Sequence, residues 1–79
     1  MIPTEKKLTY ATLTNDQKEW IDHEYSWSVR FGKSDACHIA ACIAHAYMMN
    51  VDNKSQRAES EAFSAVLTYL VWQKKVKVN

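Results

Sequence analysis

The stretch SDACHIAACIAHAYMMN, residues 34–50, carries no charged side chain after its first two residues, apart from its histidines. Ser34 is a residue type favoured at a helix N-cap, and the carboxylate of Asp35 suits the positive end of a helix dipole. A surface helix shows a polar face, and this stretch shows almost none. The pattern predicts a helix at about residues 35–49 that is enclosed on most sides, with the rest of the chain packed around it.

The composition limits the chain to one small helical domain. It has 79 residues, of which 47% are hydrophobic and 24% are charged, a balance typical of a folded globular chain. One glycine and one proline are too few for the turns of an all-β protein. A chain of this size hides only roughly 60% of its unfolded surface. We therefore expect a single all-α domain over residues 1–79, of modest stability.

The N-terminal segment, residues 1–13, is expected to be an extended arm. Pro3 disfavours helix in the residue before it, and residues 6–13 alternate roughly between polar and apolar types. A short strand is the alternative, but a strand needs a partner and only residues 76–78 offer one. An arm laid across the helices is the preferred interpretation.

The first helix is expected at about residues 15–31. Thr14 and Gln17 match a capping box, and Gly32 stands where a helix end favours a positive φ angle. Its apolar side is expected to comprise Trp20, Trp27 and Phe31, with Leu13, Ile21 and Tyr25 at the edges.

The second and third helices complete the predicted fold. A link of two or three residues would make the first two helices antiparallel neighbours. The third helix, capped by Asp52 or Ser55, is expected at about residues 54–74. The sequence thus predicts an all-α three-helix bundle with a buried central helix and an extended N-terminal arm. The handedness of the bundle stays open.

A metal site is one hypothesis for the central helix. His38, Cys42 and His45 are spaced i, i+4 and i+7, so they share one face, and imidazole and thiolate are common zinc ligands. His23, Glu24 or Cys37 would have to supply a fourth ligand. Positions i and i+7 lie about 10 Å apart along a helix, which is a long span for one ion. The preferred alternative is a packed cysteine between hydrogen-bonded histidines, without metal or cofactor.

Enzyme activity has little support in the sequence. Cys37 and His38 are adjacent, and neighbours in a helix point about 100° apart, which does not suit activation of one by the other. The chain shows no Ser-His-Asp order, glycine-rich phosphate loop or HExxH pattern. No catalytic residue is predicted.

The sequence predicts no membrane partner and argues against nucleic acid as a partner. The formal net charge is +1, and the basic residues lie at the ends of the third helix rather than along it. Lys54, Arg57, Lys74, Lys75 and Lys77 are the residues placed to touch phosphate. No run of about 20 apolar residues and no signal peptide is seen. Two unpaired cysteines, with no such signals, favour a cytoplasmic setting.

The aromatic content exceeds what one small core holds, and interfaces are enriched in Trp, Tyr, Met and Arg. We expect a small non-enzymatic regulator or inhibitor that binds another protein, itself, or both. Half-buried rings on an ordinary monomer are the alternative. A metal- or ligand-binding regulator and a weak DNA-binding regulator remain further possibilities. The residues expected to contact the partner are Tyr25, Trp27, Val29, Tyr69 and Trp72.

Overall fold

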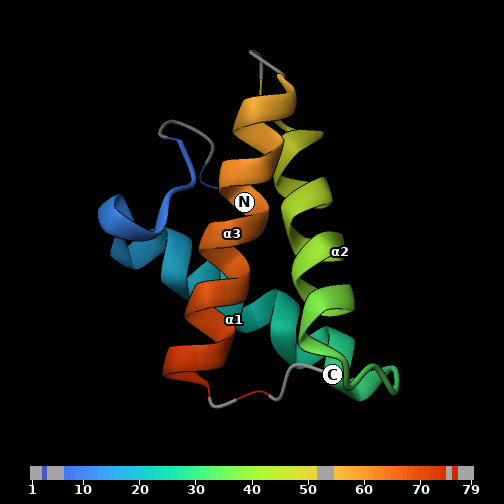
Figure 1. Ribbon diagram of the computed structural model, residues 1–79. Helices are drawn as coiled ribbons and strands as arrows, with labels where there is room; N and C mark the ends of the chain where they lie inside the picture. The colour runs from blue at the N-terminus through green and yellow to red at the C-terminus, as the bar shows by residue number, and fades with distance from the viewer. Residues whose placement is uncertain (1–2, 4–6, 52–54, 75, 77–79) are drawn as a thin grey trace.

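The computed structural model describes residue 3, residues 7–51, residues 55–74 and residue 76. In chain order, its elements are a 3-10 turn η1 at Tyr10–Thr12 and the helices α1 at Asn15–Arg30, α2 at Ala36–Met48 and α3 at Gln56–Gln73 (Figure 1). No described residue belongs to a strand, and the predicted all-α three-helix fold is confirmed. Across the described part of the chain, none of the helices combines the length and apolar character needed to cross a membrane.

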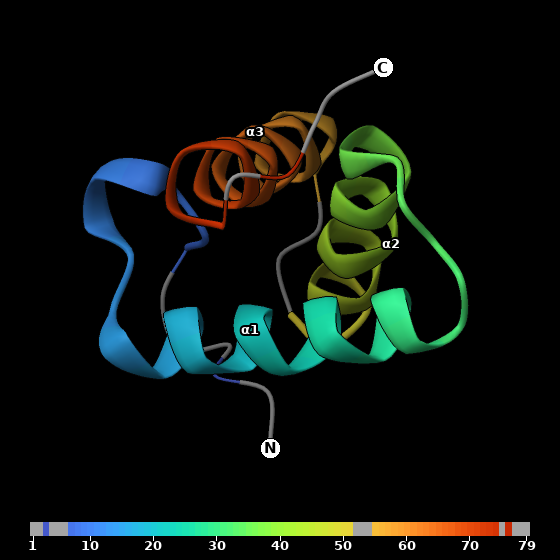
Figure 2. The same ribbon diagram turned by 90° about the horizontal axis from the view of Figure 1, so that it is seen from below.

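The antiparallel pair of helices is not the one that the sequence predicts. α2 and α3 lie side by side and run in opposite directions, while α1 lies across them (Figure 1, Figure 2). α2 packs more extensively against α3 than against α1. The prediction that the first two helices are antiparallel neighbours is wrong. The link between them spans residues 31–35, longer than the two or three residues expected, and this length lets the chain change direction.

Local capping defines where α1 and α3 begin. The Thr14 hydroxyl accepts a hydrogen bond from the Gln17 backbone N–H at 3.1 Å, and the Gln17 side chain accepts one from the Thr14 N–H at 2.9 Å. This is the predicted capping box. At α3 the Ser55 hydroxyl accepts from the Ala58 N–H at 3.1 Å, so Ser55 is the cap. The other cap candidate, Asp52, lies outside the described residues.

The turn after α1 depends on Gly32, which has a φ angle of +88° as predicted. The Gly32 N–H donates to the Val29 carbonyl, and the Lys33 N–H donates to the Ser28 carbonyl, both at 3.0 Å. These two bonds form a Schellman motif, which satisfies carbonyl groups at the helix end. The turn sends Lys33 back toward α2.

The start of α2 differs from the prediction by one residue. Asp35, rather than Ser34, is the N-cap, and its carboxylate accepts a hydrogen bond from the Cys37 N–H at 3.2 Å. Both residue types favour this position, so the sequence did not distinguish them. Asp35 as the cap places a negative charge at the positive end of the α2 dipole.

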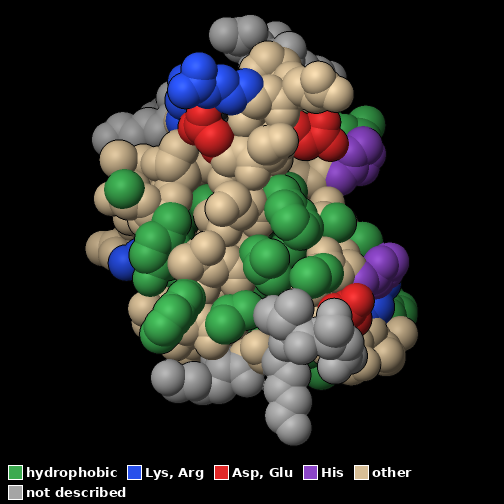
Figure 3. Space-filling view, in the orientation of Figure 1, with side chains coloured by type: hydrophobic (Ala, Val, Ile, Leu, Met, Phe, Trp, Pro, Cys, Tyr) green, Lys and Arg blue, Asp and Glu red, His purple; other side chains and the backbone are tan. Residues whose placement is uncertain are grey.

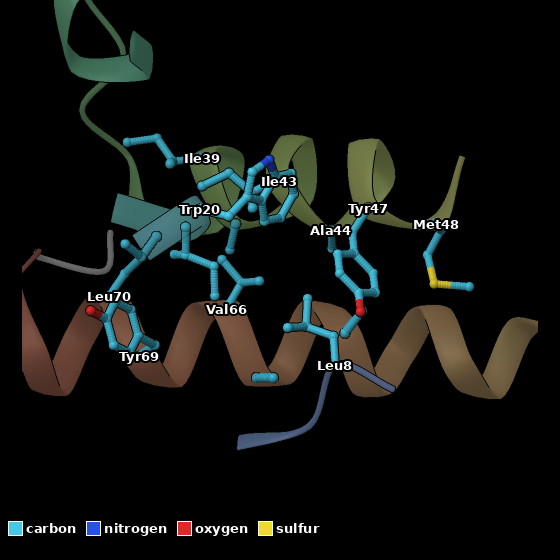
Figure 4. Close-up of a cluster of buried hydrophobic side chains, with 14 residues drawn as sticks. Leu8, Trp20, Ile39, Ile43, Ala44, Tyr47, Met48, Val66, Tyr69 and Leu70 are labelled. Carbon is cyan, nitrogen blue, oxygen red and sulfur yellow. The ribbon is translucent and has the colours of Figure 1, made fainter. Parts of the chain in front are cut away.

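The core lies where α2 meets α3 and α1 (Figure 4). α2 buries two sides, through Ala36, Ile39, Ala40, Ile43, Ala44, Tyr47 and Met48. Ala62 and Ala65 on α3 are also buried, and such small side chains allow the two helices to approach closely. One stripe of α2 remains exposed and carries His38, Ala41 and His45. α2 is therefore central, as predicted, but open along this stripe.

The N-terminal arm is held by a buried polar network. Gln17, 1% exposed, donates through Nε2 to the Lys7 carbonyl at 3.2 Å and to the Tyr47 hydroxyl at 3.3 Å. The Tyr47 hydroxyl donates to the Pro3 carbonyl at 2.9 Å. Burial raises the pKa of Tyr47, and the Gln17 hydrogen bond partly offsets the rise. Leu8 adds an apolar anchor, because its side chain is buried in the core.

The arm is not extended throughout. Residues Tyr10–Thr12 form the turn η1, which packs against α3. The turn ends the alternation expected for an extended segment, so Leu8 is buried while Tyr10 is 44% exposed. The expected extended arm is therefore interrupted at η1.

Candidate functional site: the Trp27 cluster

The buried face of α1 is not the one with the most aromatic residues. The buried residues of α1 are Gln17, Trp20, Ile21 and Ser28. The centre of that face lies roughly 60° around the helix from the expected aromatic stripe, at 100° per residue. The polar residues Gln17 and Ser28 concealed this face in the sequence. Trp20 lies at its edge, and Trp27 and Phe31 face outward.

Four side chains on the last turns of α1 form a group that we call the Trp27 cluster: His23, Trp27, Arg30 and Phe31. The rings of Trp27 and Phe31 are stacked, with centroids 5.6 Å apart and an interplanar angle of 17°. His23 meets Trp27 edge to face, at 6.2 Å and 79°. The Arg30 guanidinium carbon lies 5.6 Å from the Trp27 ring centroid, within cation–π distance.

A hydrogen bond holds the Trp27 ring in place. Trp27 Nε1 donates to Nε2 of His23 at 3.0 Å, which requires the neutral histidine tautomer with its proton on Nδ1. The residues are spaced i and i+4 along α1, so the helix itself presents the three rings as one row. The cluster is thus preorganised, which reduces the entropy lost when a partner binds.

The exposure of the cluster is unusual for residues of this kind. Trp27 is 44% exposed and Phe31 is 75% exposed. Phe31 had been expected in the core. It falls at the C-cap of α1, directly before Gly32, where the helix ends.

The other residues expected to contact a partner do not join this cluster. Val29 is 47% exposed, but it lies two residues from Trp27, on the far side of α1. Tyr25 is partly buried against the core. Trp72 is 66% exposed and belongs to the end of α3. The five predicted contact residues therefore do not form one surface.

Tyr69 is a correction to the predicted contact surface, because it is only 7% exposed. Its hydroxyl donates to the Asp22 carboxylate at 2.9 Å, which provides a hydrogen-bond partner for a buried ring. Burial, together with the Asp22 hydrogen bond and charge, raises the pKa of Tyr69 to about 12. The same carboxylate forms an ion pair with Lys74 at 3.2 Å. Tyr69 joins α3 to α1 and is not a surface residue.

The predicted histidine–cysteine face does not form a three-ligand site. Cys42 Sγ lies 3.8 Å from Nε2 of His38, while His45 borders a separate groove with Met48 and Met49. No group of three or more His, Cys, Asp or Glu side chains able to hold a metal occurs among the described residues. Besides His38, Lys33 also contacts the Cys42 sulfur, with its Nζ 3.5 Å from Sγ.

Two of the basic side chains considered for nucleic acid already have acidic partners. Arg57 pairs with Glu61 at 3.4 Å, and Lys74 pairs with Asp22. The other three candidates, Lys54, Lys75 and Lys77, lie outside the described residues. The described part of α3 shows no row of unpaired basic residues facing one direction.

The α2–α3 face offers a less defined surface than the Trp27 cluster. Its hydrophobic side chains are interrupted by other atoms, and histidines lie along the α2 edge (Figure 3). Phe63 and Leu67 of α3 are partly buried against the core. No protein-family model, curated protein or solved structure matches this chain.

Proposed function

We propose that the chain is a small non-enzymatic regulator or inhibitor that binds another protein through the Trp27 cluster. The observation that carries the proposal is the stacked, exposed pair of Trp27 and Phe31 beside Arg30. Tryptophan and arginine are the residue types most enriched among side chains that dominate binding energy. The free thiols of both cysteines suit a cytoplasmic setting, which is part of the proposal.

The exposed rings provide enough apolar surface for a binding anchor. Aromatic side chains bury 150–250 Å² each, so exposures of 75% and 44% leave about 250 Å² on Phe31 and Trp27 together. At about 25 cal/mol per Å², covering this area contributes about 6 kcal/mol before the cost of association. The pair is therefore sufficient as the centre of an interface but needs surrounding polar contacts.

Arg30 defines the chemistry of those contacts. Its guanidinium lies over Trp27, and none of the described carboxylates forms an ion pair with it. A guanidinium that stacks on a ring still has N–H donors at its edge, and these fit a carboxylate. The partner is accordingly a protein surface that offers an acidic side chain next to an apolar or aromatic one.

Affinity capture and a binding titration test the proposal. The tagged chain is used to isolate a partner, and the dissociation constant is then measured for the wild type, Trp27→Ala and Phe31→Ala. Each substitution is expected to weaken binding by about 30-fold or more, the loss of a hot-spot residue. Trp72→Ala is the matched control, because that ring is 66% exposed, between Trp27 and Phe31, but lies on α3.

The outcome for the control decides between surfaces. Unchanged binding in Trp27→Ala and Phe31→Ala, with helicity intact by circular dichroism, refutes the role of the cluster. Loss of binding in Trp72→Ala alone moves the interface to the end of α3. If native mass measurement finds a dimer that Trp27→Ala dissociates, the partner is a second copy of the chain instead of another protein.

A further inference from the structure

Cys42 is surrounded by two nitrogen-bearing side chains from different segments. Lys33, from the link between α1 and α2, places Nζ 3.5 Å from Cys42 Sγ. His38, one turn earlier on α2, places Nε2 3.8 Å from the same sulfur. Cys42 is a partly exposed residue with a free thiol, so it lies at the surface that a small molecule reaches. Neither the Trp27 cluster nor the proposed binding function uses these three residues.

The Lys33 contact is a product of the tertiary structure. The Schellman turn at Gly32 fixes the backbone of Lys33 through its hydrogen bond to the Ser28 carbonyl. The lysine side chain is then partly buried and reaches across to α2. A lysine placed in this way supplies a positive charge and a hydrogen-bond donor beside the sulfur.

Cys37 provides a contrast within the same helix. It is also partly exposed and has a free thiol. No described side chain donates to its sulfur, and its nearest charged neighbour in the chain is the Asp35 carboxylate, which caps its own backbone N–H. The two cysteines therefore differ mainly in their surroundings, with a positive group at one and a negative group near the other.

We propose that Cys42 is a reactive thiol that low-molecular-weight disulfides modify, with Lys33 and His38 as the groups that promote the reaction. The thiolate is the nucleophile in such exchange. His38 Nε2 accepts the proton of the Cys42 thiol, and Lys33 stabilises the negative charge left on the sulfur. The sulfur then attacks one sulfur of the disulfide.

The exchange is balanced without any other reactant. A new S–S bond joins Cys42 to one half of the small disulfide, while the original S–S bond breaks. The other half leaves as a thiolate and takes the proton from His38. Cys42 is oxidised and the leaving sulfur is reduced. Because Lys33 is positive, a disulfide with carboxylates near its sulfurs is preferred over one with amines.

The wild-type protein contains its own comparison, so the first measurement needs no variant. The chain is incubated with oxidised glutathione, which is anionic, and separately with cystamine, which is cationic. Peptide mass spectrometry follows the adduct at each cysteine over time. We expect Cys42 to react about tenfold faster than Cys37 with oxidised glutathione, and this ratio to fall with cystamine.

Two further measurements separate chemical activation from simple exposure. In concentrated urea the two cysteines should react at equal rates, because the Lys33 and His38 contacts are lost. Lys33→Gln should slow only Cys42, by about tenfold, and should reduce the preference for the anionic disulfide. His38→Gln should change the pH profile of the Cys42 rate while that of Cys37 stays the same.

Equal rates at the two cysteines in the folded wild type would overturn the proposal, as would a faster Cys37. It is also overturned if Cys42 is faster but Lys33→Gln, folded by circular dichroism, leaves both its rate and its disulfide preference unchanged. In that case exposure alone explains the difference.

Discussion

Replacing Gln17 by leucine is expected to weaken the whole fold, because this side chain connects three parts of it. Its Oε1 accepts from the Thr14 N–H at 2.9 Å, and its Nε2 donates to the Lys7 carbonyl and the Tyr47 hydroxyl. Leucine has a similar size but makes none of these bonds. The substitution therefore removes one half of the α1 capping box and the buried connection of the arm to α1 and α2.

The expected loss can be estimated from these contacts. Each hydrogen bond contributes about 1 kcal/mol, and a buried partner left unsatisfied costs about 1–3 kcal/mol. The apolar leucine offsets part of this, which leaves a net loss of about 2–4 kcal/mol. A chain of 79 residues has a free energy of unfolding of roughly 4–12 kcal/mol. The variant is thus expected to lose a large fraction of its stability.

Urea denaturation followed by circular dichroism measures this loss. With an m-value of about 1 kcal/mol per M, the midpoint should fall by about 2–4 M. Trypsin should also cut after Lys7 sooner in the variant, because the Lys7 carbonyl is no longer held. Gln73→Leu is the matched control, since Gln73 is exposed at the end of α3, and it should stay within about 0.5 kcal/mol of wild type. A Gln17→Leu variant as stable as this control would refute the role assigned to the network.

Three further predictions concern single positions. Gly32→Ala should lower the free energy of unfolding by about 1 kcal/mol in urea denaturation, because its φ of +88° strains any side chain, although the space around it is open; an unchanged midpoint would contradict this. Ala44→Leu should cost about 1–3 kcal/mol by overpacking the buried α2–α3 contact, while Ala41→Leu, on the exposed stripe of α2, should be close to neutral in the same assay. Tyr69 has a folded pKa of about 12, above its usual value of 10.0, so its contribution to stability is complete below pH 10 and is lost as the pH rises from 10 to 12. Denaturation at several alkaline pH values should show this loss in the wild type, and a smaller one in Tyr69→Phe, where Tyr47 still titrates; equal losses would contradict the assignment to Tyr69.

The sequence alone determined the helical elements and, to within two residues, their ends. The capping box at Thr14 and the positive φ of Gly32 were predicted correctly, and the α3 cap, Ser55, was one of the two candidates that the sequence offered. These features involve hydrogen bonds and backbone angles within a few residues, so short sequence patterns specify them. The one cap predicted wrongly, Ser34 instead of Asp35, was a choice between adjacent residues of equal preference.

Only the tertiary structure decided which side of each helix is buried and which side chains meet. A helical wheel treats Trp20, Trp27 and Phe31 as one stripe, yet α1 lies across α2 and α3 and buries a face that includes Gln17. A buried polar residue does not contribute to a hydrophobic pattern, so its burial depends on partners distant in the chain, here Lys7 and Tyr47.

The two sites proposed for function have the same origin. The Trp27 cluster is exposed because the helices cross where they do, and Cys42 meets Lys33 because the turn at Gly32 returns the chain to α2. The sequence identified Trp27 and Cys42 as notable residues but grouped each with a side chain that lies elsewhere in the structure. It grouped Trp27 with Tyr69, which is buried, and Cys42 with His45, which borders a separate groove. Helix formation is local and is specified by local sequence, whereas contacts between helices depend on how three faces share one small core.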